Sequence, residues 1–224
     1  EMVSLTCAIT ADCGCSPFIH GLNFAPHFQR MTMFGLFKKK PLVMTVTLNA
    51  RLQPFDRHDI EDAFDATMAS RGHAIRIIGG GTAMLPNGEA SECDIEVQLD
   101  KPSEDLIDLV IGTFDAMLGV KGSRATIPGR DGPTPFGRLD GLALYLNGTD
   151  LPDAIYEATS AQHVYEECQS LLSGIGSVSS NWQGDTETAI YMYGPSFSAM
   201  RDAIADFVRN YPLLPDLRWC VLPV

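Results

Sequence analysis

The sequence predicts an α+β fold in which one structural unit occurs twice. Three observations support this prediction. Residues 48–54 and 146–152 share one frame, in which leucine and asparagine are followed by four variable positions and proline. Each frame is followed by the same expected order of strands and helices. Apolar and capping positions farther along the chain also coincide between the copies. The repeated frame therefore indicates a structural repeat and does not indicate a catalytic or binding function.

The first copy is expected to contain a strand, a helix, two strands, a helix and a strand, at residues 43–50, 54–72, 73–78, 93–99, 102–118 and 124–128. The first segment is rich in Val and Thr, as strands are. In the first helix, Ile60, Phe64 and Met68 recur every four residues and form one apolar stripe. Residues 79–89 contain a glycine run and an Asn-Gly pair, which predict a loop. In 93–99 apolar residues alternate with polar ones, the pattern of a half-buried strand.

The second copy repeats this order at residues 142–147, 151–172, 178–183, 188–193, 195–211 and 217–222. A shift of 93 residues places Val97, Leu99, Pro102, Ser103, Ile107, Ile111 and Phe114 on Ile190, Met192, Pro195, Ser196, Met200, Ile204 and Phe207. The order β-α-β-β-α-β is that of the ferredoxin-like arrangement, with two helices on one face of a four-stranded antiparallel sheet. We therefore predict a tandem repeat of two ferredoxin-like units.

These patterns divide the chain into four parts. Residues 1–40 have no sustained period, and we expect a weakly ordered extension there. Met31 or Met33 would make a natural start, which leaves open whether residues 1–30 belong to the natural protein. The first unit is predicted at 41–128 and the second at 140–224. Residues 129–139, which are rich in glycine and proline, are predicted to form a linker.

Charge and hydropathy restrict the partners. The net charge is -12; residues 1–40 hold four basic and two acidic residues, which leaves 12 basic and 26 acidic residues in the rest. Such a field repels nucleic-acid phosphates and attracts a basic protein. We expect no membrane span, because no stretch reaches about 18 apolar residues without charges. The amino-terminal segment makes a poor secretory signal, so cytoplasm is the expected compartment.

No pattern predicts a metal, a cofactor or a catalytic centre. Cys7, Cys13 and Cys15 lack the paired C-x2-C spacing of zinc sites. Cys93, Cys168 and Cys220 fall in expected strands or helices, as small buried residues do. The glycine run at 79–81 is followed by proline and a turn, whereas a phosphate-binding loop leads into a helix. Enzymatic activity is left open, and we favour its absence.

The sheet face opposite the helices differs between the copies. Alternation places Tyr145, Tyr191 and Tyr193 on this face of the second copy, with Trp182 close by. The first copy has Asp94 and Glu96 on the corresponding face. RNA-recognition domains stack bases on such aromatic faces, but residues 131–224 hold only four Lys or Arg against twelve Asp or Glu. Two interpretations remain: the aromatic residues pack copy against copy, or they contact a protein or a ligand.

The leading functional hypothesis is a non-enzymatic acidic binding protein that recognises another, basic protein. Its predicted contact residues are Tyr145, Trp182, Tyr191, Tyr193, Asp94 and Glu96. Small acidic inhibitors and immunity proteins act in this way, because charge steers the encounter and buried aromatic residues hold the complex. An open sheet face and exposed edge strands are also surfaces through which two copies of the chain could form a homodimer.

The alternative hypothesis is a small-ligand sensor. The loop after the first strand holds Asn49 in the first copy and Asn147 and Asp150 in the second, where the sequence is GTDLPD. In element order the chain resembles paired ferredoxin-like modules of the ACT type, without a diagnostic motif. The resemblance implies that an amino acid or a similar metabolite binds near these residues. A third hypothesis is an enzyme of unrecognised type.

Overall fold

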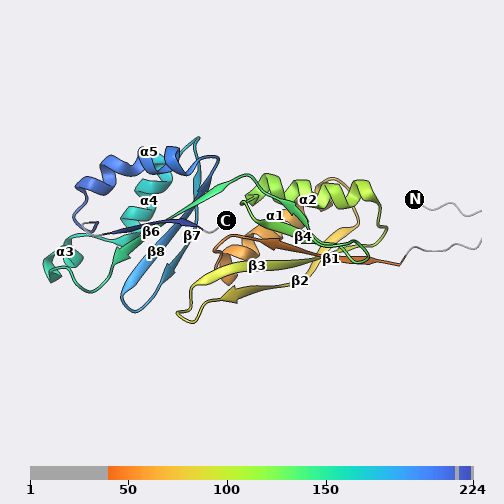
Figure 1. Cartoon of the computed structure of the whole chain (residues 1–224), viewed down its shortest axis with the longest axis horizontal. Helices are drawn as coiled ribbons and strands as arrows, with labels where there is room; N and C mark the ends of the chain where they lie inside the picture. The colour runs from red at the N-terminus through yellow and green to blue at the C-terminus, as the bar shows by residue number, and fades with distance from the viewer. Residues whose placement is uncertain (1–39, 215–216, 223–224) are drawn as a thin grey trace, which may run out of the picture. The chain divides into compact units, whose positions relative to one another are not determined.

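The computed structural model describes residues 40–214 and 217–222. The predicted amino-terminal extension, apart from Lys40, lies outside the described residues, and so do Cys7, Cys13 and Cys15. The first copy contains β1 (Leu42–Leu48), α1 (Pro54–Ser70), β2 (Ile75–Met84), β3 (Ala90–Leu99), α2 (Glu104–Leu118), β4 (Ser123–Thr126) and β5 (Thr134–Phe136). The second contains β6 (Asp140–Asn147), α3 (Asp153–Ala158), α4 (Ala161–Leu171), β7 (Ser177–Gln183), β8 (Glu187–Gly194), α5 (Phe197–Asn210) and β9 (Arg218–Leu222) (Figure 1).

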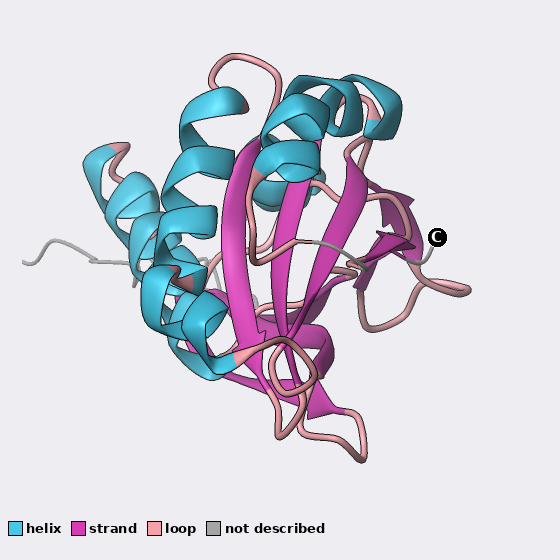
Figure 2. Ribbon diagram, turned by 90° about the vertical axis from the view of Figure 1, so that its left-hand side faces the viewer, coloured by secondary structure: helices cyan, strands magenta, loops and turns pink. Residues whose placement is uncertain are grey.

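The strand order confirms two ferredoxin-like units. The first sheet has the order β2-β3-β1-β4-β5 and the second the order β7-β8-β6-β9. All the strand pairs in both sheets are antiparallel. Without β5, both sheets place the second, third, first and fourth strands of the unit side by side, which is the ferredoxin-like order. Figure 2 shows the strands side by side with the helices packed against them.

Each unit has its own apolar core between its helices and its sheet. In the first, the rings of Phe64 on α1 and Phe114 on α2 stack with their centroids 4.5 Å apart above the apolar residues of β1 and β3. In the second, Val164, Met200 and Ile204 pack on Leu144 and its neighbours. These are the stripes that the period of about 3.6 residues predicts.

The two copies cap their second helices in the same way. The Ser103 hydroxyl accepts a hydrogen bond from the backbone N–H of Leu106, and the Ser196 hydroxyl accepts one from Ala199, each at 3.3 Å. Each bond satisfies one of the N–H groups that the first helical turn leaves without a partner. The repeat is therefore visible in local hydrogen bonding as well as in topology.

Replacing Ser103 or Ser196 with alanine should lower the free energy of unfolding by about 1 kcal/mol, the usual cost of losing such a cap. Urea denaturation measures the change. Ser70→Ala is the matched control, because the Ser70 hydroxyl donates to the Thr67 carbonyl at the exposed end of α1 and caps no helix start. Equal losses in all three variants would contradict the role assigned to the caps.

The structure corrects three predicted boundaries. Residues 79–84, predicted as loop, continue β2 and pair with β3 after an irregularity between Ile77 and Gly79. Gly80 permits this, because a Cβ there would lie 2.9 Å from Oε1 of Glu61 and 3.0 Å from a guanidinium nitrogen of Arg57. The predicted linker contains β5, which pairs with β4. The predicted helix at 151–172 is two helices, since α4 has a new N-cap at Ser160.

In the described part of the chain, no helix is long and apolar enough to cross a membrane.

Candidate functional site

The aromatic face of the second sheet is buried against the first copy. Tyr145, Tyr191 and Tyr193 are 5%, 0% and 1% exposed. They belong to the same apolar cluster as the core of the first copy, separate from the cluster under α4 and α5. The structure therefore shows the first of the two interpretations, in which the aromatic residues pack copy against copy. Tyrosines buried in this way present no surface to a partner while the chain is folded.

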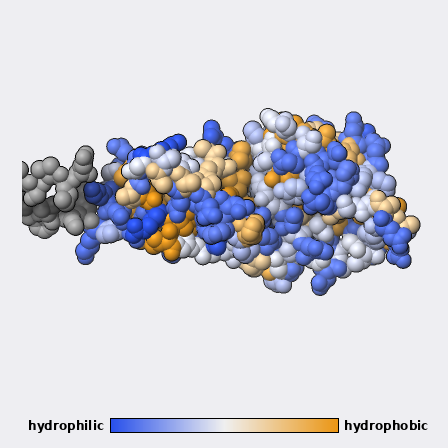
Figure 3. Space-filling model, turned by 180° about the vertical axis from the view of Figure 1, so that it is seen from behind, coloured by the Kyte–Doolittle hydropathy of each residue, from blue (hydrophilic) through white to orange (hydrophobic). Residues whose placement is uncertain are grey.

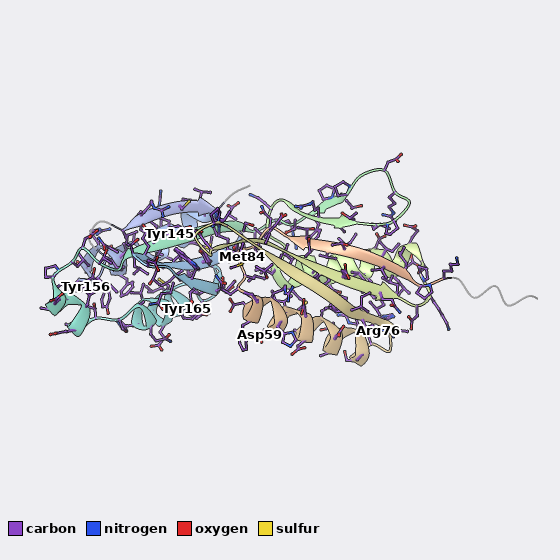
Figure 4. All side chains as sticks on the ribbon, turned by 90° about the horizontal axis from the view of Figure 1, so that it is seen from below. Asp59, Arg76, Met84, Tyr145, Tyr156 and Tyr165 are labelled. Carbon is purple, nitrogen blue, oxygen red and sulfur yellow. The ribbon has the colours of Figure 1, made fainter. Side chains whose placement is uncertain are left out.

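Glu89 is the polar centre of this contact. It lies in the turn between β2 and β3 and is 4% exposed. Its Oε1 accepts hydrogen bonds from the Tyr145 hydroxyl at 2.5 Å and from the Tyr191 hydroxyl at 2.7 Å, and it forms an ion pair with the guanidinium of Arg51. Its Oε2 accepts a bond from Nδ2 of Asn87 at 3.2 Å. Figure 4 places Tyr145 on the side of the first copy where β2 ends at Met84.

Arg51 links the loop between β1 and α1 to the second sheet. Its backbone N–H donates to the hydroxyl oxygen of Tyr193 at 2.7 Å, and its carbonyl accepts a hydrogen bond from the hydroxyl of Ser180. Its guanidinium lies 5.9 Å from the centre of the Tyr191 ring. The contact thus joins two loops of the first copy to three strands of the second. We call this hydrogen-bonded contact between the copies the junction; its members are Arg51, Glu89, Tyr145, Ser180, Tyr191 and Tyr193. Because its polar groups bond one another, the junction has a structural role.

The junction shifts the pKa values of its members in opposite directions. Burial alone would raise the pKa of Glu89, but hydrogen bonds from Tyr145, Tyr191 and Asn87 and the charge of Arg51 outweigh burial and hold it below its usual value. Burial and the hydrogen bond to Glu89 raise the pKa of Tyr145 to about 12 and raise that of Tyr191 as well. At neutral pH the carboxylate is therefore ionised and both hydroxyls are protonated donors.

The lowered pKa of Glu89 predicts a loss of stability in acid. A carboxyl group with a lower pKa in the folded chain contributes stability above its unfolded value, about 4.3. This contribution is lost as the pH falls through the folded value. Between about pH 6 and pH 3, the wild type should therefore lose more unfolding free energy than Glu89→Gln, as measured by urea denaturation. Equal losses would show that Glu89 does not carry this dependence.

Arg51, Glu89 and Ser180 are site residues that the sequence patterns did not single out. Arg51 lies within the repeated frame, and Glu89 directly follows the Asn-Gly pair of a predicted loop. Glu89 meets Tyr191 across 102 positions of sequence. The local spacing of apolar and polar residues cannot indicate a contact between residues so far apart in the sequence. The sequence offered one signal, the three tyrosines on one sheet face. A buried tyrosine hydroxyl needs a hydrogen-bond partner, so this face predicts polar partners elsewhere in the chain.

Trp182 lies at the edge of the junction, in a groove of about 630 Å³. The groove is lined from the first copy by Gln53, Asn87 and Gly88, and from the second copy by the hairpin residues 181–187. Gly88 and Gly184 both lie against the indole: a Cβ would be 3.8 Å from Nε1 at Gly88 and 2.2 Å from Cη2 at Gly184. The groove is therefore lined by a partly buried indole and by several polar side chains.

Asp94 and Glu96 are exposed on β3, on the first sheet's open face. Ile95 and Val97 point into the core under α1 and α2, so the two carboxylates point away from the helices. The Asp94 carboxylate accepts a hydrogen bond from the Thr47 hydroxyl at 2.6 Å. In residues 40–214 and 217–222, neither Asp94 nor Glu96 forms a salt bridge. Glu92, two residues earlier on the same face, accepts hydrogen bonds from both terminal guanidinium nitrogens of Arg124.

Of the residues of the ligand alternative, Asn147 and Asp150 lie together in one turn of the second copy, where Nδ2 of Asn147 donates a hydrogen bond to Oδ2 of Asp150 at 3.3 Å, and Asn49 lies in the first copy. Asn49 donates to the Lys121 carbonyl at 2.8 Å and holds two loops of the first copy together. Asn147 accepts hydrogen bonds from the backbone N–H groups of Thr149 and Asp150, so it forms the turn that follows β6. Asn147 thus has the local backbone role that this residue type often has in turns, whereas Asn49 joins segments that are distant in the sequence.

Across the described ranges, no three His, Cys, Asp or Glu side chains gather as ligands for a metal ion.

Comparisons with known proteins add little beyond the fold. No family model matches the sequence, and no curated protein matches it. Similar solved structures include an unknown protein from Galdieria sulphuraria, with 14% identity over 83% of this chain and 98% of that one and a TM-score of 0.25. Another is the regulatory subunit of aspartate kinase from Thermus flavus, with 10% identity, coverage of 75% and 92% and a TM-score of 0.26. A third contains the first two RRM domains of yeast poly(U) binding protein, with 10% identity, coverage of 81% and 99% and a TM-score of 0.22. Similarity at this level carries no functional argument, and the fold assignment rests on the strand order.

Proposed function

We propose that this chain is a non-enzymatic binding protein that recognises a basic protein through the open face of its first sheet. One observation supports the proposal above all: Asp94 and Glu96 stand exposed on that face, and neither has a salt-bridge partner in the described ranges. The second sheet uses its open face to pack on the first copy. Within residues 40–214 and 217–222, the open face of the first sheet therefore keeps two exposed carboxylates that a partner can contact.

The shape of this face suits an extended partner. On β2, Gly81 pairs with Asp94 and Gly79 pairs with Glu96, so no side chain from β2 covers either carboxylate. A Cβ at Gly79 would lie 2.9 Å from Oε2 of Glu96. Carboxylates two residues apart on a strand are spaced by about 6.5 to 7 Å, the same spacing as alternate side chains of a second extended chain. Lysine or arginine at alternate positions of the partner would match them.

The charge of the whole chain supports the same partner. The net charge is -12, and such a field accelerates the approach of a basic protein. Figure 3 shows hydrophilic side chains over most of one face of the molecule, with smaller hydrophobic areas between them. Charge then steers the encounter, and Asp94 and Glu96 fix where the partner docks. We place this encounter in the cytoplasm, the compartment that the sequence predicts.

The test compares the wild type with the isosteric variant Asp94→Asn/Glu96→Gln. Each immobilised full-length chain is offered a synthetic extended peptide with lysine at alternate positions, and its binding is measured at low and at high salt. We expect the variant to bind the peptide about tenfold more weakly at low salt, because two charge-assisted contacts are lost. The difference should shrink at high salt, which screens exposed charges.

The matched control is Asp108→Asn/Glu157→Gln, which removes the same charges from exposed positions on α2 and α3. It should bind the peptide as the wild type does, apart from a small general loss of attraction. Equal weakening in both double variants would mean that only net charge acts, and the site assignment would then fail. A peptide with glutamate in place of lysine should not bind any of the three proteins.

A further inference from the structure

The groove at the junction of the two copies has the dimensions of a small-molecule site. Its volume of about 630 Å³ lies within the range of roughly 300 to 1,000 Å³ that is usual for such sites. Both copies contribute to its walls, so a ligand there would touch the β1–α1 loop, the β2–β3 turn and the β7–β8 hairpin. This site is separate from the acidic face of the first sheet and does not depend on it.

The side chains of the groove define what it would accept. Four carboxamides line it, those of Gln53, Asn87, Asn181 and Gln183. Each carboxamide offers both donors and an acceptor. None of the lining residues is Lys, Arg or His, and Asp185 and Glu187 add two carboxylates, which accept hydrogen bonds. A phosphate or carboxylate would find no counter-charge there, and the net charge of the chain would repel it.

The carboxamides also distinguish a hydroxyl from an amine. A polyamine has only donors, so it leaves the carboxamide N–H groups that face the groove without an acceptor. A hydroxyl both donates and accepts, and therefore pairs with either atom of a carboxamide.

We infer that this groove binds an uncharged, polyhydroxylated molecule of the size of a mono- or disaccharide. The hydroxyls of the sugar pair with the carboxamides, and its C–H surface packs on the indole of Trp182. The glycines at 88 and 184 keep side chains away from that indole. Because the ligand contacts both copies, binding holds the junction closed and raises the stability of the chain.

Thermal melting and calorimetric titration of the full-length chain test the inference. The probes are glucose, galactose, mannose, N-acetylglucosamine, maltose, cellobiose and lactose, with glucose 6-phosphate and spermidine as charged comparators. At least one neutral sugar should raise the melting temperature and bind with measurable heat, while both comparators bind more weakly. Trp219→Phe leaves Trp182 as the single indole of the chain, since the sequence has two tryptophans. Its fluorescence should then change on binding.

Asn181→Ala/Gln183→Ala locates the site. Both side chains are exposed, so this variant should fold as the wild type does and lose about tenfold or more in sugar affinity. Asn210→Ala on α5, which removes a carboxamide far along the sequence from the groove, should bind normally. The inference is overturned if no neutral sugar binds, if the comparators bind more tightly, or if the double variant binds as well as the wild type. Failure here leaves the peptide test of the acidic face unaffected.

Discussion

Replacing Glu89 with alanine is expected to lower the free energy of unfolding by about 3 to 5 kcal/mol, the usual cost of breaking a buried ion pair from one side. The variant leaves the Arg51 guanidinium without its carboxylate and the hydroxyls of Tyr145 and Tyr191 without their acceptor. The side chains of Arg51 and Glu89 are 14% and 6% exposed, so water replaces little of what is lost. Urea denaturation followed by circular dichroism measures the change.

Three further variants separate the effect of a buried, unpaired charge from the loss of an exposed ion pair. Glu187→Ala removes one partner of the half-exposed pair with Arg218 and should cost no more than about 1 kcal/mol. Arg51→Met/Glu89→Leu removes both charges of the junction, and should be less destabilised than Glu89→Leu alone because no charge is left buried without a partner. If Glu89→Ala costs no more than Glu187→Ala, Glu89 does not hold the two copies together.

Replacing Tyr191 with alanine should cost about 3 to 5 kcal/mol, the range for removing a large aromatic side chain from a core. Tyr191 is fully buried between the copies, so its loss leaves a cavity and removes one of the hydrogen bonds to Oε1 of Glu89. Tyr191→Phe keeps the ring and removes only the hydroxyl; it should cost about 1 to 3 kcal/mol. Thermal and urea unfolding should rank the two variants in this order.

Phe55→Ala is the control for this prediction. Phe55 is 75% exposed, and its removal should change the unfolding free energy by no more than about 0.5 kcal/mol. An exposed aromatic residue that contacts only a binding partner would, like Phe55, change the unfolding free energy little when it is replaced by alanine. A Tyr191→Ala variant as stable as Phe55→Ala would therefore contradict the packing of copy on copy.

The local elements followed from the sequence because each depends on near neighbours. The alternation in β3 reflects the strand period of two residues, and Ser103 and Ser196 cap helices whose first turns begin at the next residue. The exposed positions of Asp94 and Glu96 follow from the same alternation. The repeated frame ends the first strand of each unit and leads to a proline at a helix start, at Pro54 and Pro152.

Boundaries set by pairing were harder to predict. Glycines at 79–81 favour a loop by their own preference, yet strand β3 supplies hydrogen-bond partners and extends β2 to Met84. The same holds for β5, which forms in a segment rich in glycine and proline because β4 lies beside it. Propensity is a weak preference, and a neighbouring strand overrides it.

By itself, the sequence determined the β-α-β-β-α-β order that both units share, the internal repeat and the alternation of residues between the faces of β3 and β8, because these depend on periods of two and about 3.6 residues. Only the tertiary structure decided that the tyrosine face is an internal surface while the acidic face stays open. That outcome depends on Glu89 meeting Tyr145 and Tyr191 across 56 and 102 positions of sequence. Contacts between residues so far apart in the chain leave no periodic trace, since they form only when one folded unit packs on the other.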